Sequence, residues 1–166
     1  MSRESDYRAQ FTELMEVFAG PVRRLCSAYA STSADRDDLF QDIFLAVWRA
    51  LPSFRGDSST RTWVYRIAHN VALSWQTRDR RRQSRETRLG EVDDEAETAD
   101  YNDLRRLALK QAIAGMKPAD RTLTLLWLEG LSAAEIETVT GVKSATVAVR
   151  LSRIRKQLNP IEASHE

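Results

Sequence analysis

Two stretches of the chain concentrate the side chains that could bind a polyanion. Residues 54–82 carry seven arginines against two aspartates, and residues 143–158 carry five basic residues and no acidic one. The formal net charge of the whole chain is only +1, so these stretches are separate basic regions on a nearly neutral protein. Such clusters are typical of nucleic-acid contact at two points, although a basic run can also be simply a solvated helix face.

The residue types needed for covalent or metal chemistry form no recognisable pattern. Cys26 is the only cysteine, which excludes an intramolecular disulfide and a Cys/His zinc site and favours a role in core packing. The sequence contains no GxxxxGK[ST], HExxH or GxSxG motif. His69 has no neighbouring metal ligands, and we interpret it as a polar surface residue. We therefore expect no catalytic residue, no metal site and no cofactor.

The second basic region lies in the most specific motif, residues 130–158. Ser132 and Glu135 predict a capping box that opens a short helix, Gly141 predicts a tight turn, and Ser144 predicts the cap of the next helix. The apolar residues of that helix share one face, namely Val147, Leu151, Ile154 and Leu158. Its basic residues lie away from this face, namely Arg150, Arg153, Arg155 and Lys156. This pattern predicts a helix-turn-helix that fits the DNA major groove, with a plain helical hairpin as the alternative.

The elements that must position these regions are helices. In the first half, apolar residues recur at spacings of three and four over 7–29, with a break or kink expected at Gly20 and Pro21. A second helix is expected to begin with Ser33 as its cap and to stop before Pro52. A loop at 54–60, ending in Ser and Thr that can cap, leads into a long third helix that continues into the arginines of 78–82.

The second half repeats the helical period after an acidic stretch with six acids in residues 91–100. We therefore predict an all-α fold with two small helical domains joined by an acidic linker. The expected boundaries are 1–82 for the first domain, 83–103 for the linker and 104–160 for the second domain. A helix-turn-helix by itself leaves repressors, activators, recombinases and sigma factors open.

Two long segments resemble one known family. Residues 35–82 are similar to domain 2 of extracytoplasmic-function (ECF) sigma factors, and residues 116–158 resemble domain 4, in the family's order with an acidic linker between them. The resemblance implies a sigma factor that binds core RNA polymerase, directs promoter recognition and transcription initiation, and catalyses nothing itself. The alternative is a stand-alone helix-turn-helix transcriptional regulator. The missing catalytic cluster disfavours a nucleic-acid-modifying enzyme.

The resemblance also implies three groups of contact residues. The first docks on the β′ clamp of the polymerase and comprises Asp38, Gln41, Asp42, Phe44 and Leu45. The second binds the minus-10 element through a loop that receives a flipped base and through the long helix, and comprises Arg55, Gly56, Asp57, Ser58, Trp63, Arg66, Asn70, Ser74, Arg78 and Arg81. The third reads the minus-35 element and comprises Lys143, Ser144, Thr146, Ala148, Val149, Arg150, Arg153, Arg155 and Lys156.

The residue types agree with these roles to different degrees. An acidic and amide-bearing ridge suits an arginine-rich protein partner, and an aromatic residue beside Arg and Asn suits single-stranded DNA. Trp63 is equally compatible with the core. Late basic residues of the recognition helix are expected to hold phosphates, while Ala148 and Val149 can pack on thymine methyl groups.

The sequence departs from the family pattern at three positions, with Ser74 for the usual Asp, Glu137 for a common Ala and Thr140 for a common Leu. The implied partners are core RNA polymerase through its β′ clamp and β flap, promoter DNA and an anti-sigma factor. Because the sequence has neither an apolar leader nor a membrane-spanning run, we expect a cytoplasmic protein without membrane insertion.

Overall fold

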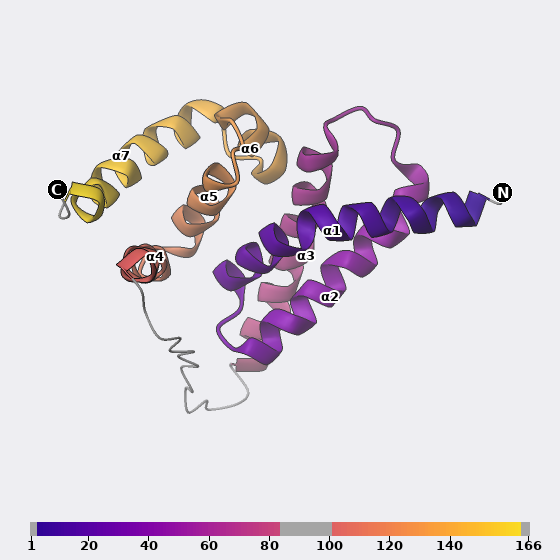
Figure 1. The fold of residues 1–166 in the computed structure, drawn as a ribbon, viewed down its shortest axis with the longest axis horizontal. Coiled ribbons are helices and arrows are strands. Elements are labelled where there is room, and N and C mark those ends of the chain that lie inside the picture. The colour runs from indigo at the N-terminus through magenta and orange to yellow at the C-terminus, as the bar shows by residue number, and fades with distance from the viewer. Residues whose placement is uncertain (1–2, 84–100, 164–166) are drawn as a thin grey trace. The chain divides into compact units, whose positions relative to one another are not determined.

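The computed structural model describes residues 3–83 and 101–163, and these residues form helices and no strand (Figure 1). The prediction of an all-α fold is confirmed. The chain divides into two compact units, Met1–Val92 and Asp93–Glu166. Most of the predicted linker lies outside the described residues, but its first residue, Gln83, ends one helix and its last three begin the next.

Three long helices form the first unit: α1 (Arg3–Tyr29), α2 (Ser33–Ala50) and α3 (Thr60–Gln83), with a short 3₁₀ turn, η1 (Leu51–Ser53), after α2. Each of the three packs against the other two. Their common core is formed by fully buried apolar side chains, including Val22, Leu25, Leu39, Ile43, Val47, Val64 and Ala68. Burying one such Val, Leu or Ile side chain contributes about 1.5–3 kcal/mol. This core fixes which faces of α2 and α3 remain outside.

Of the break or kink expected at Gly20 and Pro21, the break is wrong, because α1 continues through Pro21. Proline removes one hydrogen bond from a helix interior and disfavours it by about 3 kcal/mol. Here the apolar stripe is buried on both sides of the proline, at Phe18 and at Leu25, which are 7% and 2% exposed. Burial of this continuous stripe against α2 and α3 offsets the cost of proline.

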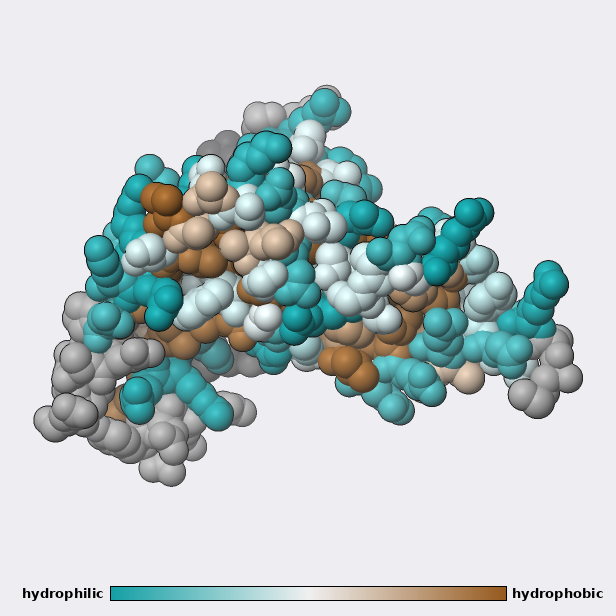
Figure 2. All heavy atoms as spheres, turned by 90° about the horizontal axis from the view of Figure 1, so that it is seen from above, coloured by the Kyte–Doolittle hydropathy of each residue, from teal (hydrophilic) through white to brown (hydrophobic). Residues whose placement is uncertain are grey.

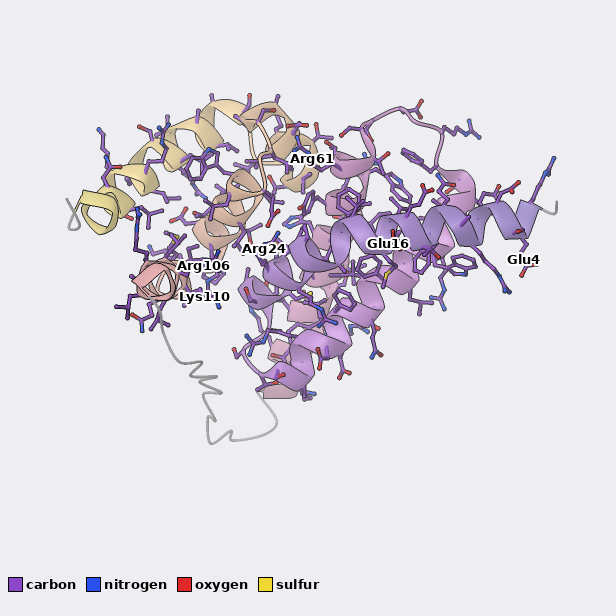
Figure 3. All side chains as sticks on the ribbon, in the orientation of Figure 1. Glu4, Glu16, Arg24, Arg61, Arg106 and Lys110 are labelled. Carbon is purple, nitrogen blue, oxygen red and sulfur yellow. The ribbon has the colours of Figure 1, made fainter. Side chains whose placement is uncertain are left out.

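The helix starts differ from the prediction by one position at α2. Thr32, not Ser33, is the N-cap, and its hydroxyl accepts a hydrogen bond from the Asp35 N–H at 3.1 Å. At α3, Ser59 accepts from the Thr62 N–H at 3.1 Å, so the predicted capping serine is confirmed. The charged residues of these helices lie mainly outside, as Glu16 on α1 does (Figure 3).

Burial shifts the pKa of two side chains in the core of this unit, Cys26 and His69. Cys26 is 1% exposed, as predicted, and burial raises the pKa of its thiol to about 12. The interpretation of His69 as a surface residue is wrong. Its side chain is 8% exposed, its Nδ1 lies 2.7 Å from the Tyr29 hydroxyl oxygen, and burial lowers its pKa. The partner is forty residues away in the sequence, so no local pattern could reveal the pair.

The second unit consists of α4 (Tyr101–Ala114), α5 (Pro118–Leu128), α6 (Ala133–Thr140) and α7 (Ser144–Ala163). The capping box of Ser132 and Glu135 is confirmed, and Gly141 ends α6 with φ of 77°, the left-handed conformation that glycine adopts without strain. α7 packs against the other three helices of the unit. The predicted helix-turn-helix is therefore formed by α6 and α7.

Candidate nucleic-acid interface

The outer side of α7 offers a surface that mixes apolar and basic groups. Val147 and Ile154 are at most 3% exposed and pack α7 onto its neighbours. Val149, Arg153 and Lys156 lie on the opposite side and are exposed, Val149 to 61%. A valine between basic residues on the outer face of such a helix can contact base edges while the cations hold phosphates.

Two arginines of α7 are held at its flanks by α5. The Arg150 Nη1 lies 3.7 Å from the Asp120 Oδ1, and the Arg155 guanidinium lies 5.7 Å from the centre of the Trp127 ring. Asp120 and Trp127 were not singled out from the sequence. Their signal is a spacing of seven residues, which places both on the side of α5 that faces α7. Arg150 and Arg155 therefore brace α7 against α5.

Glu137 links α6 to the start of α7. Its Oε2 accepts a hydrogen bond from the Ser144 N–H at 2.7 Å, and its Oε1 lies 3.9 Å from the Lys143 Nζ. Hydrogen bonds from Ser144 lower the pKa of Glu137. Ser144 is thus the first residue of α7 rather than its cap, and a side chain from α6 satisfies its backbone donor. The sequence revealed Glu137 only as a departure from the family pattern.

A second polar surface follows α3. Arg66, Asn70, Ser74 and Arg81 recur at near-helical spacing, and all four are exposed. The loop before α3 brings Arg55, Gly56 and Asp57 to the surface with Ser58 half-buried. Gly56 has φ of 76°, a conformation that other residues adopt only with strain. Hydrophilic side chains gather over much of the molecular face drawn in Figure 2, with apolar patches between them.

A cavity of about 320 Å³ lies between α2 and α3. Its lining combines acidic and amide groups of α2 with basic, acidic and aromatic groups of α3: Asp38, Gln41, Asp42, Trp75, Arg78, Asp79 and Arg82. The Arg78 Nη2 lies 3.9 Å from the Asp42 Oδ2. The Arg82 Nη2 lies 3.4 Å from the Asp35 Oδ1 and 3.0 Å from the Asp79 Oδ1.

Comparisons with known proteins give the same order of regions. The family description Sigma-70 region 2 matches residues 14–83, and Sigma-70, region 4 matches residues 106–158, so together they span about three quarters of the chain. The ECF RNA polymerase sigma-E factor of Haemophilus influenzae is 29% identical over 169 residues, which cover 94% of this chain and 88% of that protein.

The chain belongs to the sigma-70 family. Its relatives place it in the ECF group. Solved structures share the fold of this sigma factor at lower identity. The sigma factor RpoE, crystallised with the anti-sigma factor NepR from Bartonella quintana, has a TM-score of 0.78 at 20% identity and covers 95% of this chain and 99% of its own. CnrH, in complex with the cytosolic domain of CnrY, has a TM-score of 0.64 at 19% identity and covers 96% and 91%.

Two residues that the resemblance placed at interfaces of the sigma factor lie in its core. Phe44 is 4% exposed and packs edge-on against Phe11, with ring centres 6.2 Å apart, so it is no surface contact as the protein stands. Trp63 is 7% exposed, and its ring lies 4.5 Å from that of Phe54. Burial favours the core alternative for Trp63, because little of its ring is open to a stacked base.

The other predicted polymerase contacts of the sigma factor share one exposed side of α2. Asp38, Gln41 and Asp42 are exposed, and Leu45 is 45% exposed one turn further on. Within the described residues, no group of three or more His, Cys, Asp or Glu side chains is arranged to hold a metal ion. No helix in that part of the chain is long and apolar enough to cross a membrane.

Proposed function

We propose that this ECF sigma factor divides promoter reading between its two units. The ridge of Arg66, Asn70, Ser74 and Arg81 on α3, with the loop at 55–58, binds the melted minus-10 strand. The outer face of α7 reads the minus-35 element as duplex. Bases of a melted strand need exposed polar and basic groups along a groove, whereas a duplex needs a helix that enters the major groove.

One observation favours this proposal over a stand-alone regulator. The first unit presents an exposed acidic side on α2 and an exposed basic ridge on α3. An acidic surface repels DNA, so it suits a protein partner with basic groups. We assign Asp38, Gln41, Asp42 and Leu45 to the β′ clamp of core RNA polymerase. The second unit is assigned to the β flap, and the acidic segment between the units to the positively charged RNA path.

Transcription with purified components tests this function. The sigma factor should co-purify with core polymerase and direct run-off transcription from its promoter, and should bind promoter DNA tightly only as part of the holoenzyme. Tight duplex binding by the free protein, without any affinity for core polymerase, would establish the stand-alone regulator in its place.

An anti-sigma factor is a further proposed partner. Two solved structures of similar fold are complexes with a protein partner: the sigma factor RpoE with the anti-sigma factor NepR, and CnrH with the cytosolic domain of CnrY. A protein that forms a one-to-one complex with this sigma factor and competes with core polymerase in a titration would meet the definition. If candidate inhibitors bind and transcription is unchanged, this assignment is wrong.

A further inference from the structure

The cavity between α2 and α3 joins two surfaces to which the proposed function gives different partners. Asp42 stands among the predicted polymerase contacts and Arg78 among the predicted minus-10 contacts. In the structure the two side chains face each other across the cavity, with 3.9 Å between the Arg78 Nη2 and the Asp42 Oδ2. Each charge therefore partly neutralises the other. The two residues cannot serve both partners fully while they remain paired.

The position of Arg78 on α3 separates it from the DNA-binding ridge. Arg66, Asn70, Ser74 and Arg81 follow one side of the helix, while Arg78, Arg82 and Trp75 line the cavity beside α2. In its present position Arg78 is directed to Asp42 rather than along the ridge. It lies four residues after Ser74 and three before Arg81 on the helix, so a change of side-chain rotamer is enough to bring its guanidinium towards the ridge.

Exposure distinguishes the exchangeable arginine from the fixed one. The side chains of Arg78 and Asp42 are 67% and 48% exposed, and their contact is long. Arg82 instead binds two carboxylates, those of Asp35 and Asp79, whose side chains are only 10% and 14% exposed, at 3.4 and 3.0 Å. Exposed ion pairs are weak and pairs with shielded carboxylates are stronger. Arg78 is therefore the arginine that a competing cation can displace.

The lining of the cavity fits such a competing cation. Asp38, Gln41 and Asp42 present oxygen acceptors from α2, and the half-buried ring of Trp75 lies on the α3 side. Carboxylates together with an indole face suit a guanidinium, which donates in-plane ionic hydrogen bonds to the carboxylates and stacks through its face. A volume of about 320 Å³ exceeds that of one arginine head group with its water.

We propose that the cavity receives an arginine side chain of the polymerase clamp, and that this arginine takes over Asp42 and releases Arg78 to a phosphate of the melted strand. Polymerase binding and strand capture are then coupled through one exchanged ion pair. The inference rests on the proposed function, because it requires that α2 meets the polymerase. No rearrangement of the helices is involved.

The first test is the affinity of the full-length protein for core RNA polymerase. Arg78→Gln removes the internal competitor, so it should bind core polymerase about twofold to fivefold more tightly than the wild type, the range expected for one exposed ion pair. Arg80→Gln is the matched control, since it removes the same charge from the same helix end without lining the cavity. When Asp42 is replaced in the Asp42→Asn variant, the gain in core affinity caused by Arg78→Gln should shrink to the gain caused by Arg80→Gln.

The second test is strand binding by the assembled holoenzyme. With a premelted promoter, Arg78→Gln should bind more weakly than Arg80→Gln and lower the log-log salt slope by about 0.7, the value for one phosphate on a single strand. Equal core affinities for Arg78→Gln and Arg80→Gln would overturn the exchange. The exchange would also be overturned if Arg78→Gln raised the core affinity of the Asp42→Asn variant as much as it raised that of the wild type. If the wild type fails to bind core polymerase, the proposed function itself is wrong.

Discussion

Val149 is the residue of the recognition helix whose exposure most needs an explanation. It is 61% exposed among basic and small side chains on the outer side of α7. Contact with a thymine methyl group in the major groove would remove this apolar surface from water. We therefore expect this side chain to contribute sequence reading, while its basic neighbours contribute affinity.

This role can be measured by replacing thymine with uracil in the minus-35 duplex, which deletes only the methyl group. The wild-type holoenzyme should lose about 0.8 kcal/mol of binding free energy, the value of one buried methylene-sized group. Val149→Ala should bind both duplexes nearly equally. If the wild type does not distinguish thymine from uracil at any position, Val149 makes no such contact.

Glu137 connects the stability of the helix-turn-helix to pH. Hydrogen bonds from Ser144 lower its pKa from the ordinary value of 4.5, so the unfolded chain takes up a proton at higher pH than the folded chain. The interaction therefore stabilises the fold above about pH 4.5 and is lost as the pH falls below that value.

Thermal melts of Glu137→Gln and the wild type should differ most near neutral pH and converge in acid, because Gln has no charge to lose. Glu129→Gln is a control on the neighbouring α5–α6 connection. If the difference in melting temperature between Glu137→Gln and the wild type did not change with pH, the charge of the carboxylate would add nothing to its hydrogen bond at the start of α7.

Among the elements, α2 carries the proposed polymerase contact on its exposed side, while its other side packs into the core. Replacing Asp38 and Gln41 together with Ala should leave helicity unchanged, because both side chains are exposed. Affinity for core polymerase should fall by about 2 kcal/mol or more if they are central contacts. A titration with fluorescently labelled core polymerase measures this. Equal affinities would exclude both residues from the contact.

The junction of α4 and α5 depends on one side chain. The Arg121 guanidinium donates to the carbonyl oxygens of Ile113, Ala114 and Met116 at 3.1, 2.6 and 3.1 Å. The Ile113 and Ala114 carbonyls lie in the last turn of α4 and that of Met116 follows the helix, and the Ile113 oxygen also accepts from the Met116 N–H at 3.1 Å. Arg121 therefore joins the end of α4 to α5.

Arg121→Lys keeps the charge but cannot reach three acceptors at once. It should raise the hydrogen-exchange rates of α4 selectively and destabilise the second unit by about 1–3 kcal/mol, the range for lost hydrogen bonds to a charged group. Arg106→Lys, on α4 itself, is the matched control (Figure 3). Equal exchange in both variants would show that α4 is held by its apolar contacts alone.

A feature of an element could be predicted from the sequence when the residues that cause it lie close together in the chain. The capping box of Ser132 and Glu135 and the turn at Gly141 were predicted because their partners lie within a few residues. Pro21 was misjudged because the burial that overrides it comes from other helices. His69 was misplaced and Trp63 was left open for the same reason, since their surroundings are assembled by tertiary packing.

For the whole molecule, the distribution of charge sets how the free protein meets DNA. The stretch 91–100 carries six acids between two basic regions, and it lies outside the described residues. Acidic residues near a basic surface weaken the attraction of that surface for phosphates. At ordinary ionic strength this effect reaches about 10 Å. Free sigma factor should therefore bind nonspecific DNA less well than its basic regions alone would.

Replacing Asp93, Asp94, Glu95 and Glu97 with their amides should raise the affinity of the free protein for nonspecific duplex by several-fold at low salt. The gain should fade as salt is added, because screening acts on the same interaction. A control for net charge removes the same number of charges by amide substitution of four exposed acids of α1, namely Glu4, Asp6, Glu13 and Glu16. An equal gain in that control would assign the effect to total charge.

The buried thiol makes the chain suited to site-specific labelling. Cys26 is the only cysteine, is 1% exposed and has a pKa of about 12, so the reactive thiolate is scarce and shielded at neutral pH. A maleimide dye would leave the native protein unmodified. One cysteine introduced at the exposed Glu13 on α1 and another at the exposed Ser152 on α7 would then carry a donor and an acceptor dye without removal of any natural residue from the core. Energy transfer between them would report how the distance between the two units changes when core polymerase is added.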